Sequence, residues 1–130
     1  MDKAYPKSHV MMITGLNVIS FLIGVMLVAG PFLKGELPGS FDTTVHAGLG
    51  ALIATLAIFR AALGYGSIWI DVCLVVLGFL VLMLPTAKFM HMQWNTEYTM
   101  VHMVSGGIVM AVAVVSALAT IPVIKKMRVA

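Results

Sequence analysis

Charged residues are scarce in this chain. Among its 130 residues there are 8 lysines and arginines and 5 aspartates and glutamates. That is 10% of the sequence, whereas about a quarter is usual for a soluble domain. Hydrophobic residues make up 61%, more than the core of one small soluble domain can hold. Disorder is also excluded, because disordered segments combine low hydrophobicity with high charge. The sequence therefore predicts an integral membrane protein.

Other features that the sequence lacks exclude further classes of function. The single cysteine, Cys73, falls inside a predicted helix without the spacing of metal ligands, so a zinc site has little support. The sequence contains no paired carboxylates, no nucleophile–base pair and no glycine-rich phosphate loop, so we expect no enzyme activity. Its basic residues form no stripe with interleaved aromatic residues, and we expect no nucleic-acid partner.

Long apolar stretches separate the few charges. Four of them approach the roughly 20 residues that a transmembrane helix needs, and none shows the two-residue alternation of a membrane β-barrel. We predict an all-α membrane protein, a single domain over 1–130, with transmembrane helices at 10–33, 44–63, 68–87 and 100–124. The first stretch is longer than the apolar region of a cleavable signal peptide, so we expect it to be retained.

The distribution of lysine and arginine predicts the orientation. Two basic residues, Lys34 and Lys88, fall on one side of the predicted helices. The six on the other side are Lys3, Lys7, Arg60, Lys125, Lys126 and Arg128. Because cytoplasmic segments are enriched in these residues, both termini are predicted to be cytoplasmic. We expect a multi-pass protein of a bacterial inner membrane, in contact with membrane lipids.

An internal repeat relates the two halves of the chain, with repeat one at about 10–63 and repeat two at about 68–124. The matches, after a shift of 54 residues or of 56 beyond an insertion in the second loop, include Asn17 with Asp71, Gly24 with Gly78, Pro31 with Pro85 and His46 with His102. Two spans per copy give both copies the same orientation, related by a pseudo-twofold axis along the membrane normal. We therefore predict two tandem helical hairpins in a parallel repeat.

Four of the repeated residues have structural roles in this interpretation. Gly24 and Gly78 are expected to let neighbouring helices approach closely, where lipid provides no hydrophobic driving force. Pro31 and Pro85 lie in the last turn of their helices, where proline removes a backbone donor and favours the exit of the chain.

In each half, the glycine stands seven residues before the proline at the end of the first helix. Paired hairpins with this spacing resemble the SPW-repeat family of small bacterial membrane proteins, over about residues 17–118. The Ser-Pro-Trp motif itself is replaced by Gly30-Pro31-Phe32 and Leu84-Pro85-Thr86. The family has no established biochemical activity, so the resemblance implies an architecture alone.

His46 and His102 are the candidates for a binding site, because a pseudo-twofold axis would place them opposite each other. Two facing imidazoles are the axial ligands that a b-type haem needs, and one imidazole suffices for the magnesium of a chlorophyll-type pigment. The structural interpretation is that each histidine hydrogen-bonds its own loop, with Asp42 or Glu97 as partner. We favour the structural interpretation and expect no cofactor, with haem b or a chlorophyll-type pigment as the alternative.

A metal site is less favoured. Met90, His91 and Met92, followed by His102, offer the thioether and imidazole ligands that suit Cu(I). Methionine beside histidine is nevertheless expected without a metal in an apolar chain with 11 methionines, where methionine fills gaps between helices. We predict no metal site.

Asp71 is the one acidic residue that we place within or at the edge of a span. Carboxylates inside membranes are often functional, but Asp71 lies near the start of its helix, where the helix dipole stabilises negative charge. Arg60 is close in sequence and is expected to pair with Asp71 while its side chain extends to the membrane surface. We interpret the two residues as a structural pair.

The absence of catalytic motifs predicts a non-catalytic accessory or scaffold subunit of a larger respiratory or photosynthetic membrane complex. The alternative is an electron-transfer or pigment subunit that binds its cofactor through His46 and His102. A third possibility, a small-solute carrier, requires a polar path, and the polar residues available for it are few.

Overall fold

The computed structural model describes residues 6–35, 39–63, 67–86 and 96–129. These residues form four long helices: α1 (Lys7–Leu33), α2 (Phe41–Leu63), α3 (Ile68–Met83) and α4 (Thr96–Val129). A 3-10 helix, η2 (Leu84–Thr86), continues α3. All four segments, with α3 counted together with η2, are long and apolar enough to cross a membrane. The prediction of an all-α protein with four transmembrane helices is confirmed.

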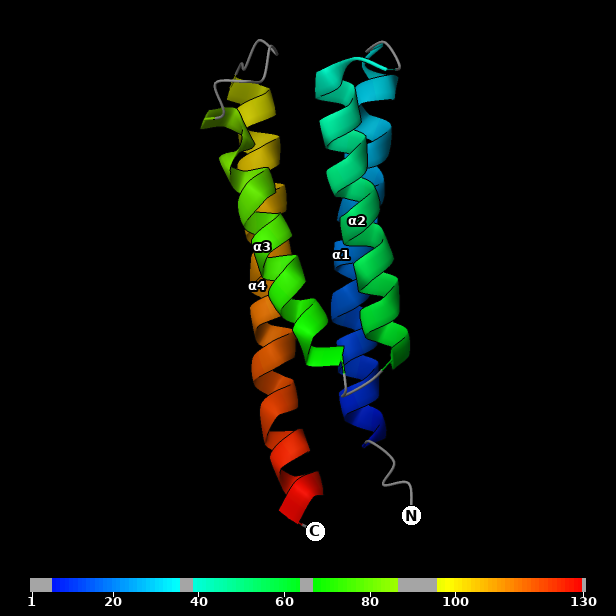
Figure 1. The fold of residues 1–130 in the computed structure, drawn as a ribbon, viewed down its shortest axis with the longest axis vertical. Coiled ribbons are helices and arrows are strands. Elements are labelled where there is room, and N and C mark those ends of the chain that lie inside the picture. The colour runs from blue at the N-terminus through cyan, green and yellow to red at the C-terminus, as the bar shows by residue number, and fades with distance from the viewer. Residues whose placement is uncertain (1–5, 36–38, 64–66, 87–95, 130) are drawn as a thin grey trace.

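The helices are arranged as two hairpins (Figure 1). Helix α1 packs along α2, and α3 packs along α4; the hairpins meet through α1 with α4 and through α2 with α3. The start of α1 and the end of α4 lie at one end of the bundle, which we call the termini end; we call the opposite end the loop end (Figure 1). Helices α2 and α3 are close at the termini end and separate toward the loop end (Figure 1).

Local sequence accounts for where several helices begin and end. Helix α1 starts directly after Pro6, whose backbone is extended (φ −56°, ψ 131°). Helix α2 begins three residues earlier than predicted because Ser40 caps it: the Ser40 hydroxyl accepts a hydrogen bond from the Thr43 amide at 3.2 Å. Helix α3 gives way to η2 at Leu84, just before Pro85, which has no amide hydrogen for the helical ladder.

One close contact between glycines recurs in both hairpins. A Cβ placed on Gly24 would lie 2.6 Å from the Gly50 carbonyl oxygen, and one on Gly78 would lie 2.9 Å from that of Gly106. Neither distance leaves room for a side chain, so in each hairpin the two backbones touch directly. Close contact of this kind provides the van der Waals packing that joins helices in lipid.

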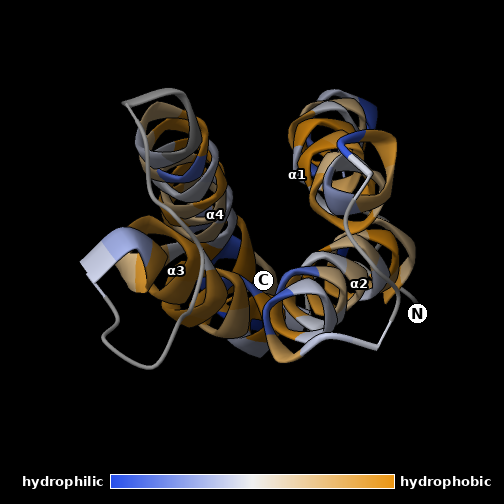
Figure 2. Ribbon diagram, turned by 90° about the horizontal axis from the view of Figure 1, so that it is seen from above, coloured by the Kyte–Doolittle hydropathy of each residue, from blue (hydrophilic) through white to orange (hydrophobic). Residues whose placement is uncertain are grey.

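Many polar residues are buried and many large apolar side chains face outward, which distinguishes this bundle from a soluble protein. Large apolar side chains are exposed on all four helices, and the orange of apolar residues recurs along all four ribbons in Figure 2. A central apolar cluster contains Leu27, Ile53, Ile70, Leu74, Val81, Val109 and Ala113. The buried polar residues are Asn17, Ser20, Thr43, His46, Arg60, Ser67, Asp71, His102, Ser105, Ser116 and Thr120.

Candidate functional site

The two predicted histidines are in direct contact near the loop end of the bundle. His46 lies in the second turn of α2 and His102 in the second turn of α4, and each side chain is 3% exposed. Their Nε2 atoms are 2.6 Å apart. The ring centroids are 4.6 Å apart and the ring planes are at 81°, an edge-to-face arrangement. The contact joins the first hairpin to the second.

The backbone of α2 fixes the orientation of His46. Its Nδ1 atom is 2.8 Å from the main-chain carbonyl oxygen of Asp42, one turn earlier. A carbonyl can only accept, so Nδ1 carries the proton and donates it. In the neutral imidazole Nε2 is then an acceptor, and it accepts from the Nε2–H of His102. Of the partners expected for His46, Asp42 is the one in contact, through its main-chain carbonyl in the first turn of α2. The contact between the two imidazoles is additional to it.

The two Nε2 atoms are too close together to bind one metal between them. Metal–imidazole bonds are about 2.0–2.1 Å long, so axial ligands on opposite faces of a haem hold their nitrogens about 4 Å apart. The Nε2 atoms of His46 and His102 are 2.6 Å apart, and a haem does not fit between them in this arrangement. Within the described part of the chain, no group of three or more His, Cys, Asp or Glu residues could hold a metal ion.

A second polar contact between the hairpins lies toward the termini end, around Arg60. The Arg60 Nε–H donates to Asp71 Oδ2 at 2.9 Å, and both side chains are buried, at 1% and 0% exposure. Its Nη1 donates to the hydroxyl of Ser67 at 3.3 Å, and its Nη2 donates to that of Thr120 at 2.8 Å. The guanidinium thus contacts both helices of the second hairpin and the residue that precedes α3.

The Arg60–Asp71 pair is buried, whereas we expected the Arg60 side chain to extend to the membrane surface. The reason is the set of hydroxyl groups around the guanidinium, which replace water as acceptors. Ser67 and Thr120 were not among the residues predicted for this site. The sequence did contain a signal for both residues. Thr120 lies one turn after Ser116 on an otherwise apolar segment of α4. Ser67 directly precedes the helix that carries Asp71.

Several buried polar atoms have no hydrogen-bond partner among the described residues. They include the second carboxylate oxygen of the pair, Asp71 Oδ1, and the hydroxyls of Ser20 and Ser116. Asn17, the residue that matches Asp71 in the proposed repeat, donates through Nδ2 to the Ile13 carbonyl oxygen at 2.9 Å. No partner for Asn17 Oδ1 is found among the residues that the structure describes.

The remaining predicted residues take different places. Pro31 is buried within the last turn of α1, whereas Pro85 is half-buried in η2. Met90, His91 and Met92, the alternative copper ligands, lie outside the described residues, as does the side chain of Glu97. The structure thus brings His46 to His102 and Arg60 to Asp71, and it separates these two pairs along the length of the bundle.

Comparison with protein-family models, with curated proteins and with solved structures finds no match to this chain.

Proposed function

We propose that this protein is a non-catalytic accessory subunit that packs within a larger membrane complex. One observation carries the proposal: its most reactive buried side chains bind each other. His46 contacts His102, and the Arg60 guanidinium contacts Asp71, in both cases between hairpins. Groups used in this way stabilise the bundle and are not aimed at a substrate.

The outward surface supports the same proposal. Exposed apolar residues occur on every helix, for example Leu22, Phe59, Val76 and Leu118, at 59%, 50%, 53% and 63% exposure. Such surfaces are suited to lipid or to the helices of a partner. We further propose a bacterial inner-membrane location with the termini end in the cytoplasm, supported by the excess of basic residues at that end. Similarity to the SPW-repeat family remains a prediction.

Photo-crosslinking in native membranes tests the accessory role. A photoreactive amino acid is placed at each of the four exposed positions named above, and at the fully buried Ile53 as the matched control. We expect at least one exposed position to give a single protein adduct of defined mass and Ile53 to give none. Adducts with lipid alone at all four positions, together with migration as a 13.9 kDa monomer on native gels, would contradict the proposal.

A cofactor-binding subunit is the second candidate, and the orientation of His46 favours it. A histidine that binds a metal through Nε2 commonly donates Nδ1–H to a backbone carbonyl, as His46 does to Asp42. Haem or pigment ligation would require the imidazoles to separate. The absorption spectrum of the protein purified from its native membrane is the test. A Soret or pigment band that is lost in both His46→Ala and His102→Ala would support this candidate, and a colourless protein would reject it.

A further inference from the structure

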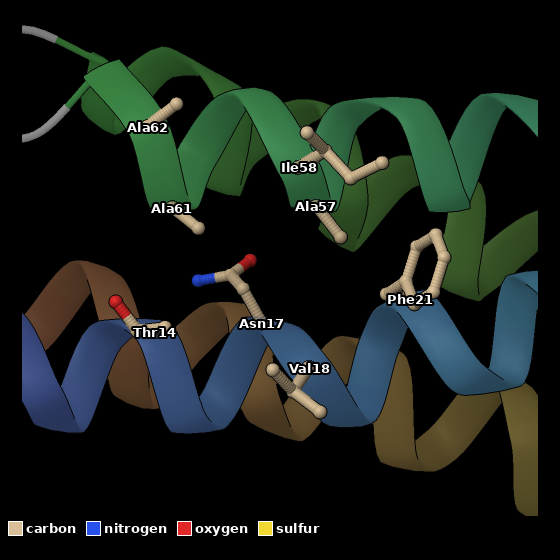
Figure 3. Close-up of a pocket in the computed structure, with 8 residues that line it drawn as sticks. All are labelled: Thr14, Asn17, Val18, Phe21, Ala57, Ile58, Ala61 and Ala62. Atoms are coloured by element: carbon tan, nitrogen blue, oxygen red, sulfur yellow. The ribbon is translucent and has the colours of Figure 1, made fainter.

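A groove lies between α1 and α2 on the lipid-facing side of the first hairpin (Figure 3). Its volume is about 370 Å³, within the range of pockets that hold small molecules. Val18 and Ile58 line its opening and are 49% and 53% exposed. The groove therefore opens sideways, toward the hydrocarbon of the bilayer.

One buried polar side chain lies in this apolar groove. Asn17 is 2% exposed, and it extends from α1 toward Ala57 and Ala61 of α2 (Figure 3). Its Nδ2 donates to the Ile13 carbonyl oxygen, which fixes the orientation of the amide, because only the nitrogen can donate to a carbonyl. The oxygen Oδ1 is buried, and the described residues supply no donor to it. A donor from outside the chain would complete this site.

The position of the groove indicates how such a donor can reach Asn17. Asn17 is ten residues after Lys7, the first residue of α1, which places it about 15 Å along the helix axis. The groove opens between the exposed apolar side chains of Val18 and Ile58, where lipid hydrocarbon surrounds a membrane-spanning helix. A lipophilic molecule can therefore bring a donor to Asn17 from the side.

We propose that the groove binds a lipophilic hydroquinone. One phenolic O–H donates to Asn17 Oδ1, and the ring occupies the space between Phe21 and the small side chains of Ala57 and Ala61. Phe21 provides an aromatic face for the ring, and the lateral opening lets an alkyl or prenyl tail extend into the lipid. The corresponding quinone has only carbonyl acceptors, which cannot bond to Oδ1. The groove is therefore selective for the reduced form, whether or not the protein is an accessory subunit.

Binding to the full chain in phosphatidylcholine nanodiscs tests the proposal, with decylubiquinol kept reduced under anaerobic conditions and decylubiquinone as probes. We expect the reduced form to bind about tenfold more tightly, the factor for one hydrogen bond in a buried site. Asn17→Leu should remove this preference. Ala62→Phe, at an exposed residue of the groove wall, should weaken binding without altering the helix core. Gly48→Leu is the matched control, since it fills a different lipid-facing groove, between α2 and α3, and should change nothing.

Equal affinity for the two redox forms, or unchanged binding in Asn17→Leu, would overturn the proposal. Absence of binding by either form would do the same. Farnesol, which has a hydroxyl donor but no ring, should not displace decylubiquinol. Displacement at equal concentration would show that the groove recognises an aliphatic alcohol, and it would overturn the assignment to a hydroquinone.

Discussion

The two hairpins share a packing contact but differ in their buried polar groups. Gly24 touches Gly50 in the first hairpin, as Gly78 touches Gly106 in the second. Asn17 in the first hairpin corresponds to Asp71 in the second, under the 54-residue shift of the proposed repeat.

The residue that approaches each of these positions also differs. Arg60 reaches across from α2 to Asp71. Ser116, its counterpart after a shift of 56, is too short to form an equivalent pair with Asn17. Close backbone packing between glycines thus occurs in both hairpins. Of the two corresponding positions, Asp71 forms an ion pair and Asn17 has no charge to form one. The difference indicates that small residues define the frame of each hairpin, while the charged pair fixes how the hairpins are placed relative to each other.

The largest expected effect comes from breaking the ion pair at one partner. Asp71→Asn removes the carboxylate charge that faces the Arg60 guanidinium, which is buried at 1% exposure. Loss of one partner of a buried pair costs about 3–5 kcal/mol, so the free energy of unfolding should fall by that amount. Loss of helical circular dichroism during titration with sodium dodecyl sulfate measures it.

A matched double variant shows whether the cost arises from the uncompensated charge. Arg60→Met with Asp71→Leu replaces both partners by apolar residues, which is often neutral or stabilising for a buried pair. We expect the double variant to be closer to the wild type than Asp71→Asn is. A double variant as unstable as the single one would show that the hydroxyl contacts of Arg60, and not its charge, hold the hairpins together.

The next largest effect is expected when a methyl group is added at the glycine contact of either hairpin. In Gly24→Ala the new methyl group meets only atoms at 2.6–2.9 Å, two of them in the backbone of Gly50 and Ala54. In Gly78→Ala the closest atom is Met110 Cγ at 2.8 Å, in a flexible side chain that can move, and two backbone atoms, the Gly106 carbonyl oxygen and the Met110 amide nitrogen, follow at 2.9 and 3.0 Å. Overpacking costs about 1–3 kcal/mol, and we expect both variants to be destabilised, Gly24→Ala more than Gly78→Ala, because its nearest backbone atom is at 2.6 Å and that of Gly78 is at 2.9 Å. The same titration measures both, and equal losses would contradict this difference between the hairpins.

A smaller effect is expected at the contact between the histidines. His46→Leu removes the hydrogen bond with His102 and keeps an apolar side chain of similar volume at the position. Interhelical hydrogen bonds in membranes contribute about 1–2 kcal/mol in small helical peptides, so a loss in this range is expected. His102→Leu should give the same loss, because the bond is the same one. A double variant that loses the sum of the two single effects would show that the imidazoles act independently.

The number of helices was predictable from the sequence because membrane spans require long uncharged stretches, and the few charges mark their limits. The repeat placed His46 opposite His102, and the short turn after α2 brought Arg60 near Asp71. The length of that contact between histidines was not predictable, since it depends on how closely α2 and α4 approach. The burial of Arg60 was missed for a related reason: Thr120 is 60 residues away from it in the chain, and sequence spacing alone does not bring such residues together.

The sequence also did not predict which glycines pack against each other between helices. Gly48 and Gly50 are equally small and two residues apart, but of the two only Gly50 has atoms of another helix within 4 Å of the point that a Cβ would occupy. The two residues point about 200° apart around a helix, so one faces α1 and the other is directed away from it. Which of them packs depends on the rotation of α2, and that rotation is determined by tertiary contacts.

The smallest expected effect is a gain in the free energy of unfolding, at Gly48. A Cβ at Gly48 meets nothing within 4 Å, so Gly48→Ala removes the conformational freedom of glycine without a clash. Glycine within a helix is less favourable than alanine by about 0.5–1 kcal/mol, and a gain of at most this size is expected. Gly50→Ala is the matched control, because a methyl group there lies 2.6 Å from the Gly24 carbonyl oxygen and should destabilise the bundle. A loss of stability in Gly48→Ala would mean that the open side of Gly48 packs against another molecule in the membrane. If the variant then became more stable than the wild type after extraction into detergent, that molecule would be a membrane partner and not a part of this chain.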